Sequence, residues 1–185
     1  MDSTFFHRFH RGTHGIWFVR FARGCYRPVV ALVRILVDGY SLLHAWPELA
    51  EGEPRHSAAA REALVRELTR YHDVVRTPIT IFFDGSGAPA GTPKVPSSPE
   101  VEILYSKVGQ TADQMIERVA YRMQKFGEVL AVTNDFAERD TVISLGGHAQ
   151  SCEQFLYALA GARDELDADL KHHNRRERER FRHTR

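Results

Sequence analysis

The fold is decided by the stretch Val33-Arg34-Ile35-Leu36-Val37-Asp38-Gly39-Tyr40-Ser41. It is a short apolar run, rich in β-branched residues, that ends abruptly in a carboxylate and a glycine. Such a run is typical of a strand buried on both faces inside a parallel sheet. Asp38 then falls at the carboxyl end of this strand, where open α/β sheets place their ligand-binding crevice.

Two later stretches repeat this design. The apolar run 78–83 is followed by Asp84 and Gly85, and the run 129–133 is followed by Asn134 and Asp135. If the three strands are parallel neighbours, their carboxylates converge on one edge of the sheet. This convergence is the basis of the functional hypothesis.

The segments between these runs complete the predicted fold. An apolar stripe at spacings of four, three and four predicts a helix from Pro54 to Val75. Residues 101–105 predict a strand, residues 136–145 a short helix, and residues 148–150 a last strand. Capping boxes at 111–114 and 151–154 predict the starts of two further helices. The order predicts a Rossmann-like three-layer α/β domain with a mostly parallel central sheet over residues 33–162.

The composition is that of an ordinary globular protein. The chain has 185 residues, of which 43% are hydrophobic and 26% are charged, and its formal net charge is +1. Any attraction to nucleic acid must therefore be local. The two cysteines, Cys25 and Cys152, are too few for a disulfide scaffold or a zinc site. No apolar segment is long enough to span a bilayer, and no convincing signal peptide is present. These features favour a cytoplasmic protein.

Both ends of the chain differ from the predicted domain. Residues 1–32 are basic and aromatic, and we expect a poorly ordered extension or a start codon assigned too far upstream. The open alternatives are RNA binding, a membrane-surface segment or a transit peptide. Residues 163–185 are highly charged and predict a solvated helix or tail, with a basic arm for RNA or the ribosome as the alternative.

Four acids stand at recurring strand or helix ends, namely Asp38, Asp84, Asp113 and Asp135. Gathered at one sheet edge, they would repel one another unless cations were present. Oxygen-only ligands select hard ions such as Mg²⁺ or Mn²⁺, and such a site can clamp a phosphodiester. Each acid also has a structural interpretation, because Asp-Gly is a common turn and acids favour helix N-termini. Together the four favour a metal site.

The motifs resemble the YacP-like branch of the NYN domains, which are relatives of PIN nucleases. The resemblance rests on Val37-Asp38-Gly39-Tyr40-Ser41, Ala45-Trp46-Pro47, Val101-Glu102-Ile103, Thr111-Ala112-Asp113 with Ile116-Glu117, and Thr133-Asn134-Asp135-Phe136. It implies a PIN-like fold and a metal-dependent endoribonuclease, with Asp38, Asp113 and Asp135 as metal ligands and Asp84 assisting. It also makes the ribosome a candidate partner, because characterised relatives cut mRNA during translation. The family usually has asparagine where this chain has Ser41.

The expected function is hydrolysis of RNA, single-stranded RNA or mRNA above all, with Mg²⁺ or Mn²⁺ as cofactor. Lys94, Lys107 and Arg139 could bind backbone phosphates and Ser41 an acid or a phosphate, although the ordinary interpretation of each lysine or arginine taken singly is a solvated surface charge. Glu117 could orient water. The rival hypothesis is a non-catalytic RNA- or ribosome-binding module with the same fold. An aspartyl phosphatase would need an acid at the position of Tyr40.

Overall fold

The computed structural model describes residues 9–11, 17–20, 26–29, 32–85, 97–107 and 109–183. Its centre is a five-stranded sheet in the order β6-β5-β4-β7-β8, and every neighbouring pair is parallel. The strands are β4 (Leu32–Asp38), β5 (Ile79–Phe83), β6 (Val101–Tyr105), β7 (Glu128–Val132) and β8 (His148–Gln150). The predicted α/β class and parallel central sheet are thus confirmed.

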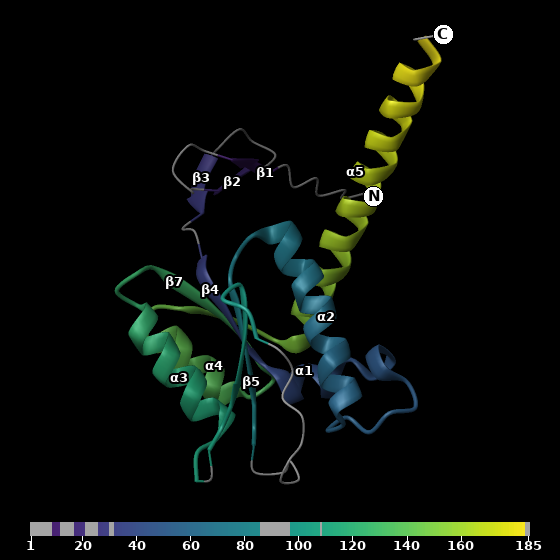
Figure 1. The fold of residues 1–185 in the computed structure, drawn as a ribbon. Coiled ribbons are helices and arrows are strands. Elements are labelled where there is room, and N and C mark those ends of the chain that lie inside the picture. The colour runs from purple at the N-terminus through teal and green to yellow at the C-terminus, as the bar shows by residue number, and fades with distance from the viewer. Residues whose placement is uncertain are drawn as a thin grey trace, which may run out of the picture.

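Helices cover both faces of this sheet (Figure 1). They are α1 (Gly39–Ala45), α2 (Ala58–Val75), α3 (Ala112–Met123), α4 (Phe136–Ser144) and α5 (Cys152–His183), with a short 3₁₀ helix η1 (Pro47–Ala50) after α1. One apolar core joins the sheet to α1, α2 and the start of α5, and a second joins it to α3 and α4. Because strand side chains alternate, Ile35 and Val37 enter the first core while Leu36 enters the second. Asp38, two residues after Leu36, belongs to the α3–α4 face.

The helix starts follow their capping residues. Thr111 and Gln114 form the predicted capping box of α3. Ser151 and Gln154 exchange the two hydrogen bonds of the second predicted box, at the start of α5. The helix predicted from Pro54 instead begins at Ala58, because the hydroxyl of the preceding serine accepts the N–H of Ala60 and caps the helix there.

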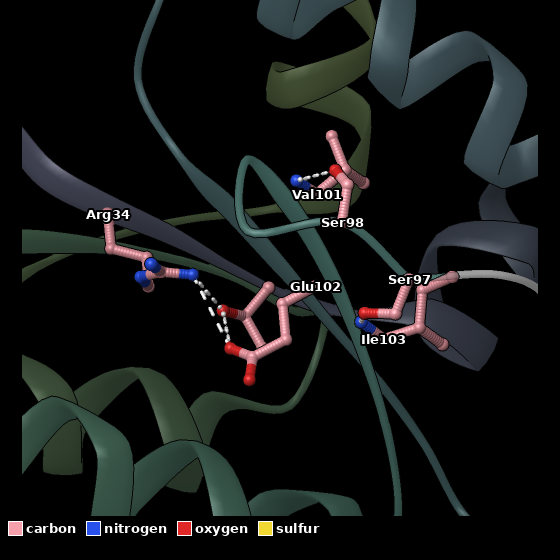
Figure 2. A network of polar contacts seen from close by, with 7 residues as sticks. Arg34, Ser97, Ser98, Val101, Glu102 and Ile103 are labelled. Carbon is pink, nitrogen blue, oxygen red and sulfur yellow. Dashed lines mark hydrogen bonds and ion pairs between the residues drawn. The ribbon is translucent and has the colours of Figure 1, made fainter.

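A polar network ties the amino-terminal halves of three strands together (Figure 2). The Arg34 guanidinium on β4 donates to the Thr80 hydroxyl on β5 at 2.8 Å and lies 3.5 Å from Glu102 on β6. The hydroxyls of Ser97 and Ser98 accept backbone N–H groups of the edge strand β6. These bonds satisfy polar groups at the end of the sheet opposite the acids, so the network is structural.

The two ends of the chain are organised differently. Strands β1 (Phe9–Arg11), β2 (Trp17–Arg20) and β3 (Tyr26–Val29) form a three-stranded antiparallel sheet, and among the described strands they pair with one another and not with the central sheet. Helix α5 runs without interruption through the boundary predicted at residue 163 and projects away from the domain (Figure 1). The divisions at residues 32 and 162 stay predictions. No helix in the described parts of the chain is long and apolar enough to cross a membrane.

Candidate metal centre

Asp38 is held rigidly at the carboxyl end of the central strand β4. Its Oδ1 accepts the backbone N–H groups of Tyr40 at 3.0 Å and Ser41 at 3.2 Å, which caps α1. Its Oδ2 accepts the Ser41 hydroxyl at 2.7 Å. Gly39 lets the ring of Phe83 pack directly against the backbone after the acid, because a Cβ at that position would overlap this ring. Ser41, which we predicted to bind an acid or a phosphate, therefore orients Asp38.

Two further carboxylates, from distant parts of the chain, meet beside Asp38. Oxygen atoms of Asp38, Asp113 and Glu138 all lie within 4.8 Å of one another. Asp113 is an exposed residue in the first turn of α3, and Glu138 is a buried residue in the first turn of α4. The parallel topology thus places two helix N-termini and one strand end around a single point.

Glu138 has an environment that strongly disfavours the charged form of its carboxyl group. Glu138 is only 6% exposed, and neither of its carboxylate oxygens has a hydrogen-bond partner among the residues that the structure describes. Burial raises the pKa of Glu138 to about 8, and the charges of Asp38, Asp113 and Asp135 add to the rise. The Thr133 hydroxyl lies near the carboxylate and opposes this rise without reaching hydrogen-bonding geometry. A buried carboxylate without donors is costly unless it is protonated or neutralised by a cation.

The remaining acids surround the group. Burial raises the pKa of Asp113, and the charges of Asp38, Asp135 and Asp84 raise it further, against the lowering effect of a backbone hydrogen bond. Asp135 caps α4, since its Oδ1 accepts the N–H groups of Ala137 at 2.7 Å and Glu138 at 3.3 Å. Asp84 accepts the Ser106 hydroxyl at 2.8 Å. All four predicted acids therefore lie close enough to interact, although their roles stay predictions.

The predicted phosphate-binding residues are more dispersed. Lys94 lies outside the described residues, as does most of the Gly-Pro-Ser loop that contains it. Lys107 is exposed just after β6, at the carboxyl edge of the sheet. The Arg139 guanidinium lies over the ring of Phe136, 4.2 Å from its centroid. Glu117 is exposed on α3 and does not belong to the group of three carboxylates.

Glu138 is the site residue that sequence reasoning missed. An aspartate followed three residues later by a glutamate resembles a capping box, which hides any other role. The Asp135 N–H, however, donates to the Thr133 hydroxyl and leaves Glu138 out of the cap. The signal that could have revealed Glu138 is its spacing, since it stands one turn before Val142 on the inward face of α4.

The chemistry of these side chains fits a hard divalent cation. Carboxylate oxygens are the ligands that Mg²⁺ and Mn²⁺ prefer. The unpartnered oxygens of Glu138 and the repulsion that raises two pKa values would both be relieved by a bound cation. Cys152 is buried nearby, but burial and the charges of Asp38, Glu153 and Glu138 raise its pKa to about 12, so its thiol is protonated. A separate groove of about 720 Å³ between α2 and α5 is lined by none of the site acids.

The fold and the site define an α/β domain with a parallel sheet and carboxylates gathered at its carboxyl edge. The model of the YacP-like NYN domain matches residues 35–184, and the chain belongs to that family. It is similar to the uncharacterized protein YacP of Bacillus subtilis, with 26% identity over 123 residues, covering 66% of this chain and 72% of the relative.

Two solved structures of Rae1 (YacP) from Bacillus subtilis share the fold. A mutant form aligns with a TM-score of 0.64 and 21% identity, covering 76% of this chain and 82% of that one. A second structure aligns with a TM-score of 0.61 and 22% identity, covering 74% and 79% of the two chains. The PIN-like nuclease fold implied by the family thus agrees with the arrangement of the strands and acids.

Proposed function

We propose that the protein is a metal-dependent endoribonuclease that hydrolyses single-stranded RNA or mRNA. The observation that carries this proposal is the meeting of Asp38, Asp113 and Glu138 within 4.8 Å at the carboxyl edge of a parallel sheet. The family supports it, because the YacP-like NYN domain has a PIN-like nuclease fold. Asp38, Asp113 and Asp135 remain our proposed metal ligands, Glu138 joins them, and Asp84 assists.

Each acid has a distinct task in this proposal. Asp38 presents a fixed oxygen, because three hydrogen bonds restrain its carboxylate. Glu138 would hold a proton at neutral pH without a cation, since its pKa is raised to about 8, and as a ligand it would bind the cation in its ionised form. Asp113 reaches in from α3 and is exposed to solvent, and we propose that RNA approaches the centre on this side. Asp135 keeps α4 in place through its cap.

A bound Mg²⁺ or Mn²⁺ ion would polarise a phosphoryl oxygen and make water nucleophilic at neutral pH. Water, rather than the 2′-hydroxyl of the RNA, is the proposed nucleophile, so the products carry 5′-phosphate and 3′-hydroxyl ends. Lys107, Arg139 and Lys94 are proposed to bind backbone phosphates of the RNA. The ribosome is the partner that the family resemblance suggests, which would place the activity in the cytoplasm.

The test is cleavage of an end-labelled single-stranded RNA in Mn²⁺ and in EDTA. Wild type should cleave only in Mn²⁺, and the Asp38→Asn and Asp113→Asn variants should not cleave. Asp140→Asn is the matched control, because this aspartate is exposed on α4 outside the carboxylate group, and it should cleave like wild type. Cleavage that persists in EDTA or in Asp113→Asn would contradict the proposal. RNA binding without any cleavage would instead indicate the non-catalytic module.

A further inference from the structure

One large apolar side chain is exposed at the rim of the carboxylate centre. Phe136 is 76% exposed and directly follows Asp135 at the first position of α4. Glu138, two residues later, points to the opposite side of the helix and enters the centre. The ring therefore stands beside the acids without belonging to the core. A single exposed aromatic side chain is common on protein surfaces, so a role for Phe136 depends on the groups around it.

Arg139 supplies the second observation. Its guanidinium carbon lies 4.2 Å from the centroid of the Phe136 ring. Its Nε is buried without a hydrogen-bond partner, and among the described residues the side chain forms no ion pair. The Phe136 ring thus orients the Arg139 guanidinium, and no carboxylate of the described residues pairs with this guanidinium. An exposed aromatic ring with an oriented guanidinium over it matches the base and the phosphate of a nucleotide.

We propose that Phe136 and Arg139 form a nucleotide-binding platform on the rim of the centre. The Phe136 ring stacks on the base next to the scissile phosphate, and the Arg139 guanidinium binds the adjoining phosphate. This inference rests on the proposed function, because it assumes an RNA strand that crosses the carboxylates. It adds a base-stacking contact that tolerates any base, since every base has a π face. The platform predicts affinity for unpaired RNA, whose bases are free to stack on protein side chains.

The chain contains a matched control for this pair. Phe126 is 65% exposed, and the Lys125 ammonium lies 4.9 Å from its ring centroid. It stands between the end of α3 and the start of β7, at the amino edge of the sheet and away from the acids. Its chemistry is nearly that of the proposed platform, and only its location differs.

The experiment measures binding of a short single-stranded RNA carrying 2-aminopurine to the full chain in EDTA, where metal-dependent cleavage cannot occur. Stacking on the ring should change the 2-aminopurine fluorescence, and Phe136→Ala should abolish the change and weaken binding by about 5- to 150-fold. Phe136→Tyr should retain both, and Phe126→Ala should behave as wild type. Arg139→Gln should make the salt dependence of log K less steep by about 0.7, whereas Phe136→Ala should leave it unchanged.

The outcomes separate this inference from the proposed function. If Phe136→Ala changes affinity and fluorescence no more than Phe126→Ala does, the platform does not exist, even if wild type cleaves RNA in Mn²⁺. If the fluorescence change depends on Phe136 while wild type never cleaves RNA, the platform stands and the nuclease proposal fails. Unchanged melting temperatures for both alanine variants would show that the loss reflects binding rather than unfolding.

Discussion

Replacing Glu138 by glutamine should remove a large pH dependence of stability. Glutamine copies the shape of a protonated glutamate but cannot ionise. In the folded protein without metal, burial and neighbouring carboxylates raise the pKa of Glu138 from its ordinary value of 4.5 to about 8. Below pH 4.5 the group is protonated in both the folded and the unfolded chain and contributes no difference. As the pH rises from 4.5 to 8, only the unfolded chain releases the proton, so the folded state loses stability.

The size of this loss follows from the pKa rise. At about 1.4 kcal/mol for each unit of pKa, the rise from 4.5 to about 8 corresponds to about 3 kcal/mol at pH 7 and about 5 kcal/mol above pH 8. At about 2–4 °C per kcal/mol for a chain of this size, the glutamine variant should melt about 6–12 °C above wild type at pH 7. The two proteins should melt alike near pH 4.5.

Thermal or urea unfolding in EDTA between pH 4.5 and pH 8.5 measures this difference directly. Glu117→Gln, at an exposed position of α3, is the matched control and should follow wild type across the whole range. Added Mn²⁺ should stabilise wild type more than Glu138→Gln, because the cation takes the place of the proton. Parallel stability curves for wild type and Glu138→Gln would refute the assignment of Glu138 to a repulsive, buried centre.

Three further predictions follow from the local geometry. Gly39→Ala should lower the free energy of unfolding in a urea titration by about 1–3 kcal/mol, because the new methyl overlaps the buried ring of Phe83. Gly161→Ala is the control: nothing lies within 4 Å of its added methyl, and it should raise the free energy of unfolding by about 0.5–1 kcal/mol. Ser41→Ala should weaken Mn²⁺ binding about 10- to 100-fold in calorimetry by removing the hydrogen bond that holds Oδ2 of Asp38, and unchanged binding would show that the Ser41 hydroxyl is not needed. A chain that begins at Val33 should fold and cut a simple RNA as the full chain does, since among the described strands β1–β3 pair with one another and not with the central sheet. Loss of folding would show that β1–β3 belong to the core of the domain.

The sequence predicted the sheet well because its strands carry strong local signals. A buried parallel strand is a continuous apolar run, and β4 and β5 are such runs. Capping residues fixed the starts of α3 and α5 for the same local reason. Helix α5 was ambiguous beyond residue 162, because a helix that is polar all round has no apolar stripe. Its residues after Gly161 are mostly strong helix formers, and the helix continues to His183.

The site was predictable only in part, because its members differ in what positions them. Asp38 follows from the parallel topology, and Asp113 from a capping box that fixes the start of its helix. Glu138 depends on the rotation of α4 against the sheet, which a short helix with a weak apolar pattern does not reveal. The contact between Arg139 and Phe136 is a matter of side-chain packing, and spacing alone allows many partners.

The most direct measurement is the anomalous scattering of Mn²⁺ in crystals of the full chain. If these carboxylates share a divalent cation, the crystals will show an anomalous peak bound by oxygens of Asp38, Asp113 and Glu138. A peak elsewhere, or none at millimolar Mn²⁺ with these three carboxylates left unliganded, would contradict it.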